Sequence, residues 1–230
     1  MNKITIAIDG FSSTGKSTVA KQLASALGYV YVDTGAMYRA VTYYCMEKEL
    51  ISTDKFNKEA IIGELANINI GFIFNKNLGY AEVYLNNVNI EKQIRSLEVS
   101  SFVSKVAAIS EVRQKLVEQQ QAMGKNKGVV MDGRDIGTVV FPDAELKLFM
   151  TASAETRALR RYQELLDRGD HVTYKDVLKN VEERDYIDSN RKDSPLVKAK
   201  DAIEIDNSNL SLQEQYEKVL DLVTKTLENI

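Results

Sequence analysis

The alternation of apolar and polar positions predicts strands and helices that follow one another along most of the chain. Apolar runs at residues 4–8, 29–32, 128–132, 146–150 and 202–205 have the length and composition of buried parallel strands. The stretches between them repeat apolar positions at three- and four-residue spacing, which is typical of helices packed on a sheet. We therefore predict a three-layer α/β fold with a five-stranded parallel sheet and ligands beyond the carboxyl ends of its strands.

Residues 68–90 depart from this pattern. Their apolar side chains occupy every second position and two polar turns interrupt them, which indicates an antiparallel meander. We predict that this stretch is an insert with its own small sheet. Residues 52–67 before it are predicted as a polar link and a short helix, and helical spacing returns from Val99 to Val117.

The first strand leads into a glycine-rich stretch with the spacing G-x-x-x-x-G-K-S, and an amphipathic helix follows to Leu27. In such a loop the glycines let backbone N–H groups converge on a phosphate, and the helix adds its positive N-terminal end. Lys16 is then expected to reach the terminal phosphates, and the Ser17 hydroxyl to bind Mg²⁺ directly. The predicted ATP-binding residues are Gly10, Phe11, Ser12, Ser13, Thr14, Gly15, Lys16, Ser17 and Thr18.

Asp132 ends the strand at residues 128–132. A carboxylate in this place is suited to hold metal-bound water beside a phosphate loop. The alternative is that it caps the turn that follows. We predict the metal role.

Between residues 151 and 200 the pattern predicts two helices with charged side chains on one face of each. On their own, such helices are typical of a solvated surface on which salt bridges contribute little. Beside a phosphate loop they are suited to cover a polyphosphate and exclude water, because guanidinium groups pair bidentately with phosphate oxygens. The residues are Arg157, Arg160 and Arg161, expected to act in catalysis, followed by Arg184, Asp188 and Arg191.

Composition narrows the class of protein. The 230 residues include 30 basic and 33 acidic side chains, so the net charge is −3. A protein with this net charge has no overall positive field that would attract nucleic acid. The single cysteine, Cys45, forms no internal disulfide and fits a reducing compartment. No apolar run approaches the length of a membrane span. We expect a cytoplasmic monomer that binds neither membrane nor nucleic acid.

Four stretches, in this order, resemble bacterial cytidylate kinases, a family of nucleoside monophosphate kinases. They are residues 10–17, the D-T-G-A-M-Y-R run at 33–39, the G-R-D-I-G-T run at 133–138 and residues 183–191. The resemblance implies one P-loop kinase chain over residues 1–230. Its parts would be a core at 1–38, 104–152 and 193–230, a monophosphate-binding region with the β insert at 39–103, and a helical lid at 153–192.

The resemblance also implies the reaction and the acceptor site. The reaction would be Mg²⁺-dependent transfer of the γ-phosphoryl group of ATP to CMP or dCMP. Two positions depart from the usual pattern, since Phe11 replaces a common proline and Thr34 replaces a common serine. The implied acceptor residues are Arg39, Arg134 and Arg191 for the phosphate, Ser104, Arg113 and Asp135 for the cytosine edge, Arg184 and Asp188 for the ribose, and Thr34 for the nucleotide.

These residue types suit the reaction on chemical grounds. Asp135 can accept from the cytosine amino group, whereas uracil would present a carbonyl to the carboxylate. The acceptor phosphate is already an anion, so no general base is needed and His171 has no predicted role. A kinase for UMP or dTMP remains the nearest alternative. A regulatory GTPase would need an Asn-Lys-x-Asp motif, and an RNA-binding protein would need basic residues interleaved with aromatic ones. The sequence contains neither pattern, so both classes are disfavoured.

Overall fold

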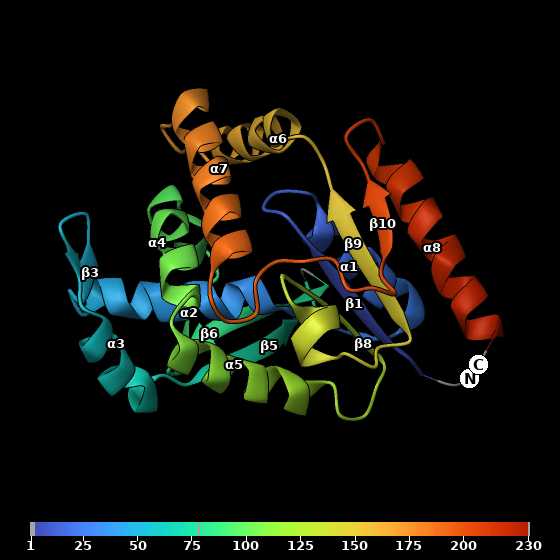
Figure 1. Cartoon of the computed structure of the whole chain (residues 1–230), viewed down its shortest axis with the longest axis horizontal. Helices are drawn as coiled ribbons and strands as arrows, with labels where there is room; N and C mark the ends of the chain where they lie inside the picture. Colours follow the sequence, from blue (N-terminus) through green and yellow to red (C-terminus); the bar gives the residue numbers. More distant parts are fainter. Residues whose placement is uncertain (1–2, 78, 230) are drawn as a thin grey trace. The chain divides into compact units, whose positions relative to one another are not determined.

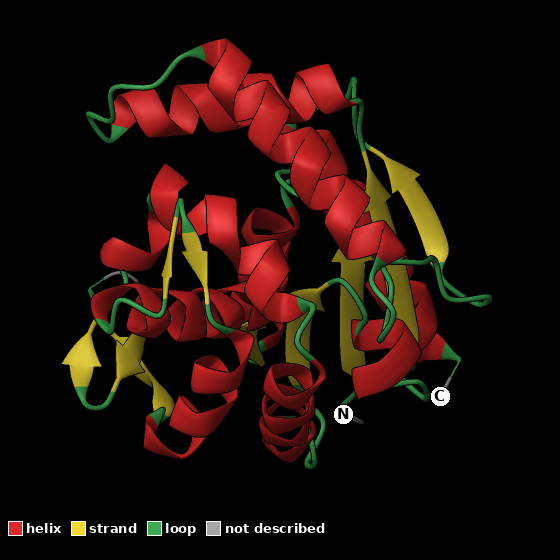
Figure 2. Ribbon diagram, turned by 60° about the vertical axis from the view of Figure 1, so that its left-hand side comes forward, coloured by secondary structure: helices red, strands yellow, loops and turns green. Residues whose placement is uncertain are grey.

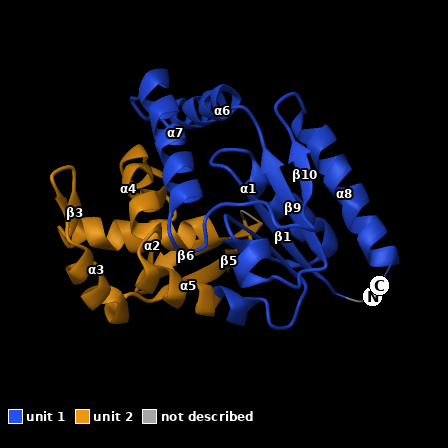
Figure 3. Cartoon of the chain, viewed as in Figure 1, with its two compact units in different colours: residues 1–33, 120–230 blue, residues 34–119 orange. Residues whose placement is uncertain are grey.

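The structure, a computed structural model, describes residues 3–77 and 79–229, which fold as two compact units. Unit 1 comprises Met1–Asp33 and Gln120–Ile230, and unit 2 comprises Thr34–Gln119 (Figure 3). The predicted boundaries after residues 38 and 103 fall inside helices α2 (Thr34–Glu47) and α4 (Leu97–Ala107), which both belong entirely to unit 2. No helix in the described part of the chain is long and apolar enough to cross a membrane.

Unit 1 contains the predicted five-stranded parallel sheet (Figure 1). Its strand order is β10-β9-β1-β8-β2, with every neighbouring pair parallel. All six residues of the central strand β1 are buried, as is typical of a parallel strand that is covered on both faces of its sheet. The strands are β1 (Thr5–Gly10), β2 (Val30–Asp33), β8 (Val129–Gly133), β9 (Leu146–Thr151) and β10 (Ile203–Asp206). The predicted sheet is therefore confirmed.

Helices α1 (Lys16–Leu27) and α8 (Leu212–Glu228) pack against one face of this sheet. The hydrophobic core there joins Ile6 and Ile8 of β1 to Leu23 of α1 and Val219 of α8. Apolar residues at helical spacing form the buried side of both helices, as the sequence predicts.

Helices α6 (Ala154–Asp167) and α7 (Tyr174–Asn190) form the predicted helical hairpin (Figure 2). Thr173 caps the N-terminus of α7, where its hydroxyl accepts from the Asp176 N–H. The rings of Tyr162 and Tyr174 meet edge to face with centroids 6.1 Å apart. The hairpin therefore has apolar contacts of its own, in addition to its charged side chains.

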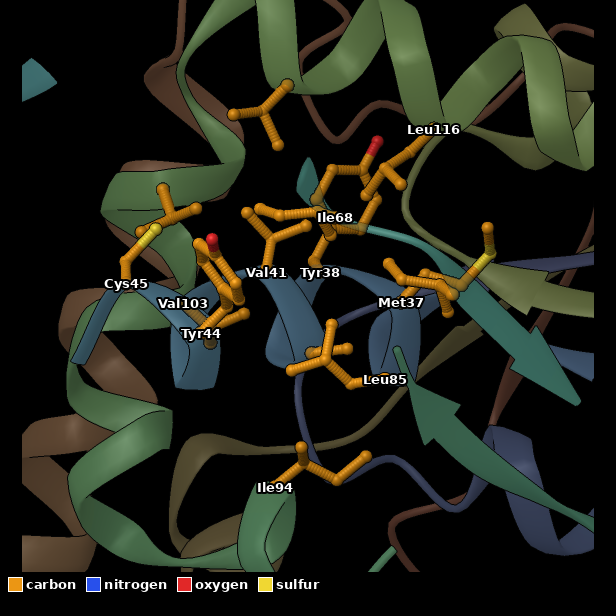
Figure 4. Packing of buried hydrophobic residues seen from close by; sticks show 14 of the residues in the cluster. Met37, Tyr38, Val41, Tyr44, Cys45, Ile68, Leu85, Ile94, Val103 and Leu116 are labelled. Carbon is orange, nitrogen blue, oxygen red and sulfur yellow. The ribbon is translucent and has the colours of Figure 1, made fainter. Parts of the chain in front are cut away.

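Unit 2 contains the predicted antiparallel sheet and its own core (Figure 4). Met37, Val41, Ile68, Leu85 and Leu116 lie in this core together with Cys45, which is buried as a small apolar residue. The strands are β5 (Ile70–Asn75), β6 (Tyr80–Leu85) and β7 (Val88–Asn89), and the helices besides α2 and α4 are α3 (Lys58–Glu64), α5 (Ser110–Met123) and the short 3₁₀ turns Leu65–Asn67 and Gln93–Arg95.

Two local predictions in unit 2 were incomplete. Residues predicted as a polar link begin with a hairpin of β3 (Ile51–Ser52) and β4 (Lys55–Phe56), which is too short to show a period of two. The helical stretch from Val99 to Val117 is two helices, because α4 ends at Ala107 and α5 begins at Ser110. Neither glycine nor proline marks this break, so the sequence carries no breaker signal there.

Candidate active site

The phosphate loop connects β1 to α1 in unit 1, and two of its glycines are required by geometry. Gly10 has a φ of 145°, and a Cβ atom built on it would lie 2.1 Å from the Met150 carbonyl oxygen. Gly15 has a φ of 86° in the left-handed region, which only glycine adopts at little cost. The first and the last glycine of the motif therefore set the path of the loop.

Lys16 supplies the positive charge of the loop, and it is buried, with 5% of its surface exposed. Its Nζ donates to the Phe11 carbonyl at 2.5 Å and to the Thr14 hydroxyl at 3.2 Å. Burial lowers the pKa of Lys16 below its ordinary value, and the charge of Arg134 acts in the same direction, while Asp132 and Asp9 oppose it. The amine is thus held inside the loop, where it can bind phosphate oxygens.

Ser17, Asp132 and Tyr31 form a hydrogen-bonded set next to Lys16. The Ser17 hydroxyl donates to Asp132 Oδ2 at 2.9 Å, and the Tyr31 hydroxyl donates to Asp132 Oδ1 at 2.8 Å. Burial raises the pKa of Asp132, and nearby Asp33 raises it further. Tyr31 was not predicted as a site residue, because an aromatic residue in an apolar strand gives no signal of function.

Oxygen atoms of this kind suit Mg²⁺, which keeps several waters and binds through one or two protein oxygens plus substrate phosphates. The described residues contain no cluster of three or more histidine, cysteine or acidic side chains that could hold a metal by themselves. Ser17 and Asp132 therefore fit a metal that arrives with a nucleotide.

We expect Tyr31→Phe to weaken Mg²⁺ binding by about tenfold, because residues that orient a metal-site carboxylate typically contribute that much or more. The variant removes only the hydroxyl that holds Asp132 Oδ1. Titration of Mn²⁺ into the ATP-loaded protein, followed by electron paramagnetic resonance, measures the affinity. Tyr29→Phe on the same stretch of chain is the control, and an equal affinity in both variants would contradict the expectation.

A second cluster in unit 1 is built around the buried carboxylate of Asp188 on α7. Arg134 Nε donates to Asp188 Oδ2 at 2.9 Å, and Arg191 Nη1 lies 3.7 Å from Asp188 Oδ1. Arg191 Nη2 lies 3.8 Å from Asp135 Oδ1. Burial pushes the pKa of Asp188 up, but the guanidiniums of Arg134, Arg184 and Arg191 outweigh it and hold that pKa below its ordinary value.

Replacing Asp188 with asparagine should lower the free energy of unfolding by about 3–5 kcal/mol at pH 7, because three buried or half-buried guanidiniums lose their counter-ion. The lowered pKa of Asp188 also sets the direction in which this stabilisation changes with pH. The stabilisation by Asp188 is present above about pH 4 and is lost as the pH falls through the depressed folded-state value. Urea unfolding measures the effect. Asp221→Asn, which removes an exposed pair with Lys225, is the control, and equal losses in both would contradict the prediction.

The predicted lid arginines have different partners. Arg157 Nη1 donates to the Ser12 carbonyl at 3.1 Å and to Asp185 Oδ2 at 2.5 Å, while Asp185 Oδ1 accepts from the Ser12 N–H at 3.3 Å. The Arg157 guanidinium also lies 5.3 Å from the centre of the Phe11 ring. Arg157 and Asp185 together connect the helical hairpin to the phosphate loop.

Arg160 contacts the same loop through a buried amide. It donates to Asn207 Oδ1 at 3.1 Å and to the Asn207 carbonyl at 2.8 Å, and Asn207 Nδ2 donates to the Thr14 carbonyl at 2.6 Å. Gln215 of α8 accepts from the same amide group. Arg161 instead pairs with Glu164 on its own helix at 2.7 Å.

Asp185 and Asn207 were not predicted, although each had a sequence signal. Asp185 lies within the stretch at residues 183–191 that resembles the kinases, and Asn207 directly follows the last residue of strand β10. Polar residues just after parallel strands are frequent ligand-site residues, and that rule would have selected Asn207.

Four predicted acceptor residues lie in unit 2. Thr34 begins α2 and is buried, Arg39 is half-buried on the same helix, and Ser104 is buried in α4. Arg113 of α5 is buried, donates to the Ala107 carbonyl at 3.2 Å and lies 5.3 Å from the centre of the Tyr38 ring. The ring of Tyr38 therefore supports Arg113, a contact that the sequence did not predict.

Unit 1 therefore combines a phosphate loop, an oxygen pair suited to a metal and a cluster of arginines. Such a set can neutralise the charge of polyphosphate and of a second anion, which is what transfer between two anions requires.

Comparison with known proteins agrees with this chemistry. A family model described as cytidylate kinase matches residues 6–225. The cytidylate kinase of Flavobacterium psychrophilum is 68% identical over 223 residues, which cover 97% of this chain and 99% of that protein. Those of Flavobacterium johnsoniae and Parabacteroides distasonis are 69% and 54% identical, and each alignment covers 99% of both chains.

Proposed function

Because the chain belongs to the cytidylate kinase family, we propose that it transfers the γ-phosphoryl group of ATP to CMP or dCMP, giving ADP and CDP or dCDP. The observation that carries the proposal is the presence, in one unit, of the phosphate loop with buried Lys16 and of the arginine cluster around Asp188. One element suits the polyphosphate of a donor, and the other suits a second anion.

On the donor side, residues 10–18 wrap the phosphates. Lys16 neutralises the negative charge of the phosphoryl group while this group moves from one nucleotide to the other. Mg²⁺ would supply further positive charge to the phosphate oxygens. Ser17 would bind it directly, and Asp132 would hold one of its waters, with the Tyr31 hydroxyl fixing the carboxylate. Arg157, Arg160 and Arg161 of the helical lid would exclude water and add positive charge.

On the acceptor side, Arg39, Arg134 and Arg191 would hold the monophosphate, and Arg184 and Asp188 the ribose hydroxyls. Thr34 would help to hold the nucleotide. Asp135, Arg113 and Ser104 would read the cytosine edge. Since the acceptor phosphate is ionised near neutral pH, these residues act by position and charge, and no side chain has to remove a proton.

The test is a coupled assay of ADP release with ATP, Mg²⁺ and one monophosphate at a time. We expect kcat/KM for CMP and dCMP to exceed that for UMP, dTMP, AMP and GMP by at least about 10²-fold, because a buried site that binds an amino group rejects a carbonyl strongly. A preference for UMP or dTMP would identify the alternative kinase. Size-exclusion chromatography should show a monomer.

A further inference from the structure

Two buried charged side chains hold the turn that follows Arg134 and Asp135. This turn, η3 (Ile136–Val140), is π-helical, and Phe141 N–H donates to the Ile136 carbonyl at 2.7 Å to close it. We propose that Asp9 and Lys147 are positioning residues for cytosine recognition, because they hold the beginning of this turn and the segment that follows it, and so fix the place of Asp135. The inference rests on the proposed function, in which Asp135 reads the base.

Asp9 of β1 holds the beginning of the turn. Its Oδ1 accepts from the Ile136 N–H at 2.8 Å, and its Oδ2 accepts from the Gly137 N–H at 2.7 Å. Both donors lie immediately after Asp135, and the Asp9 residue is only 4% exposed. Among side chains of this length, an ionised aspartate is the one that offers two acceptor oxygens to two adjacent N–H groups.

Lys147 of β9 holds the segment that directly follows the same turn. Its Nζ donates to the Pro142 carbonyl and lies 2.7 Å from Asp201 Oδ2. The stem of Lys147 also contacts the beginning of the turn, since a Cβ atom on Gly137 would lie 3.2 Å from Lys147 Cδ and 3.4 Å from Asp9 Oδ2. Such contacts are tight, so a Cβ atom at residue 137 would require the Lys147 stem to shift by a few tenths of an ångström.

Burial of Asp9 has a cost that packing alone does not explain. Burial raises the pKa of Asp9 to about 7, although the bonds from Gly137 and Ile136 and the charge of Lys16 lower it, and Asp135 adds to the increase. A buried carboxylate is often less favourable than an apolar residue of similar volume. The two hydrogen bonds from the Ile136 and Gly137 N–H groups offset part of this cost, which supports a role of Asp9 in holding the turn.

Recognition of the base depends on the position of the group that reads it. A group that reads a base has to be held within about 0.5 Å of its productive position. The position of Asp135 depends on the turn that it precedes, because its carbonyl accepts from the Val139 N–H at 2.9 Å and from the Val140 N–H at 3.2 Å. Loosening the contacts of Asp9 or of Lys147 should therefore shift Asp135 and reduce the discrimination between cytosine and uracil, while the phosphate loop keeps its own bonds.

The test compares Asp9→Asn and Lys147→Met with the wild type, and uses Glu145→Gln as the matched control. Like Asp9, Glu145 accepts a backbone N–H with its carboxylate, but its donor is Thr5 at 2.8 Å, at the opposite end of β1 from Asp9. Steady-state kinetics should show that both variants lose about tenfold or more in the CMP:UMP ratio of kcat/KM. KM for CMP should rise while KM for ATP changes less than about twofold.

Hydrogen exchange gives a readout that is independent of activity. The Ile136 and Gly137 amides should exchange at least about tenfold faster in Asp9→Asn, and stay at the wild-type rate in Glu145→Gln. An unchanged CMP:UMP ratio in folded Asp9→Asn and Lys147→Met would overturn the proposal, as would equal changes in Glu145→Gln. If Asp9→Asn fails to fold, Lys147→Met decides alone.

Failure of this inference differs from failure of the proposed function. If the wild type turns over CMP selectively and substitution of Asp135 removes the selectivity, the function stands, and only the roles of Asp9 and Lys147 are at issue. If the wild type shows no preference for CMP, the proposed function itself is wrong.

Discussion

Replacing Lys16 with methionine should reduce kcat by about 10²–10³-fold or more, because the variant removes the positive charge that we propose to lie next to the phosphates during transfer. Methionine fills most of the space of the lysine stem, so the loop keeps its path. Stability should change little. Burial already lowers the pKa of Lys16, which shows that the folded chain holds this charge at a cost.

Three measurements separate this effect from a loss of structure. Urea unfolding should give a similar midpoint for Lys16→Met and the wild type, calorimetry should still detect binding of CMP, and the coupled assay should show the loss of turnover. Lys225→Met, which removes an exposed lysine paired with Asp221 on α8, is the matched control and should retain wild-type activity. Near-normal turnover in Lys16→Met would contradict the proposed mechanism.

Strands β1, β8 and β9 could be predicted because a parallel strand that is buried on both faces has a continuous apolar sequence. Residues 128–132 and 146–150 show this directly, and β8 and β9 lie within one residue of the prediction. The break between α4 and α5 could not be predicted in the same way. It occurs at Ala108 and Ile109, where no residue disfavours a helix, so packing rather than local preference ends α4.

The residues of the candidate site also differ in whether the local sequence could predict them. Lys16 and Ser17 were predictable because the phosphate loop is a local motif whose spacing carries its chemistry. Asp9 and Tyr31 were not, because their partners lie far away in sequence. Asp9 is 127 residues from Ile136, and Tyr31 is 101 residues from Asp132. The position of Asn207 after β10 marks it as a candidate, but its partner Thr14 is 193 residues away. Only the strand order and register bring such residues together, and a motif search does not supply either.

Replacing Asp135 with asparagine should have the largest effect on specificity. If the carboxylate accepts from the cytosine amino group, an amide that presents its NH₂ group to the base would face that donor with another donor, while it could donate to the carbonyl of uracil. The CMP:UMP ratio of kcat/KM should therefore fall by about 10²–10⁴-fold, which is the range for a buried polar group left without its partner. Asp135→Ala should lower the ratio as well, without a gain for UMP.

The ratio is the decisive quantity because Asp135 also lies 3.8 Å from Arg191, a predicted ligand of the acceptor phosphate. Any disturbance of that arginine affects CMP and UMP equally and cancels in the ratio, whereas loss of base reading does not. Asp143→Asn, at an exposed carboxylate in the segment that follows the same turn, is the matched control and should leave the ratio unchanged. If Asp135→Asn keeps the wild-type ratio, Asp135 does not read the base, and cytosine selectivity must then arise from Ser104, Arg113 or other residues.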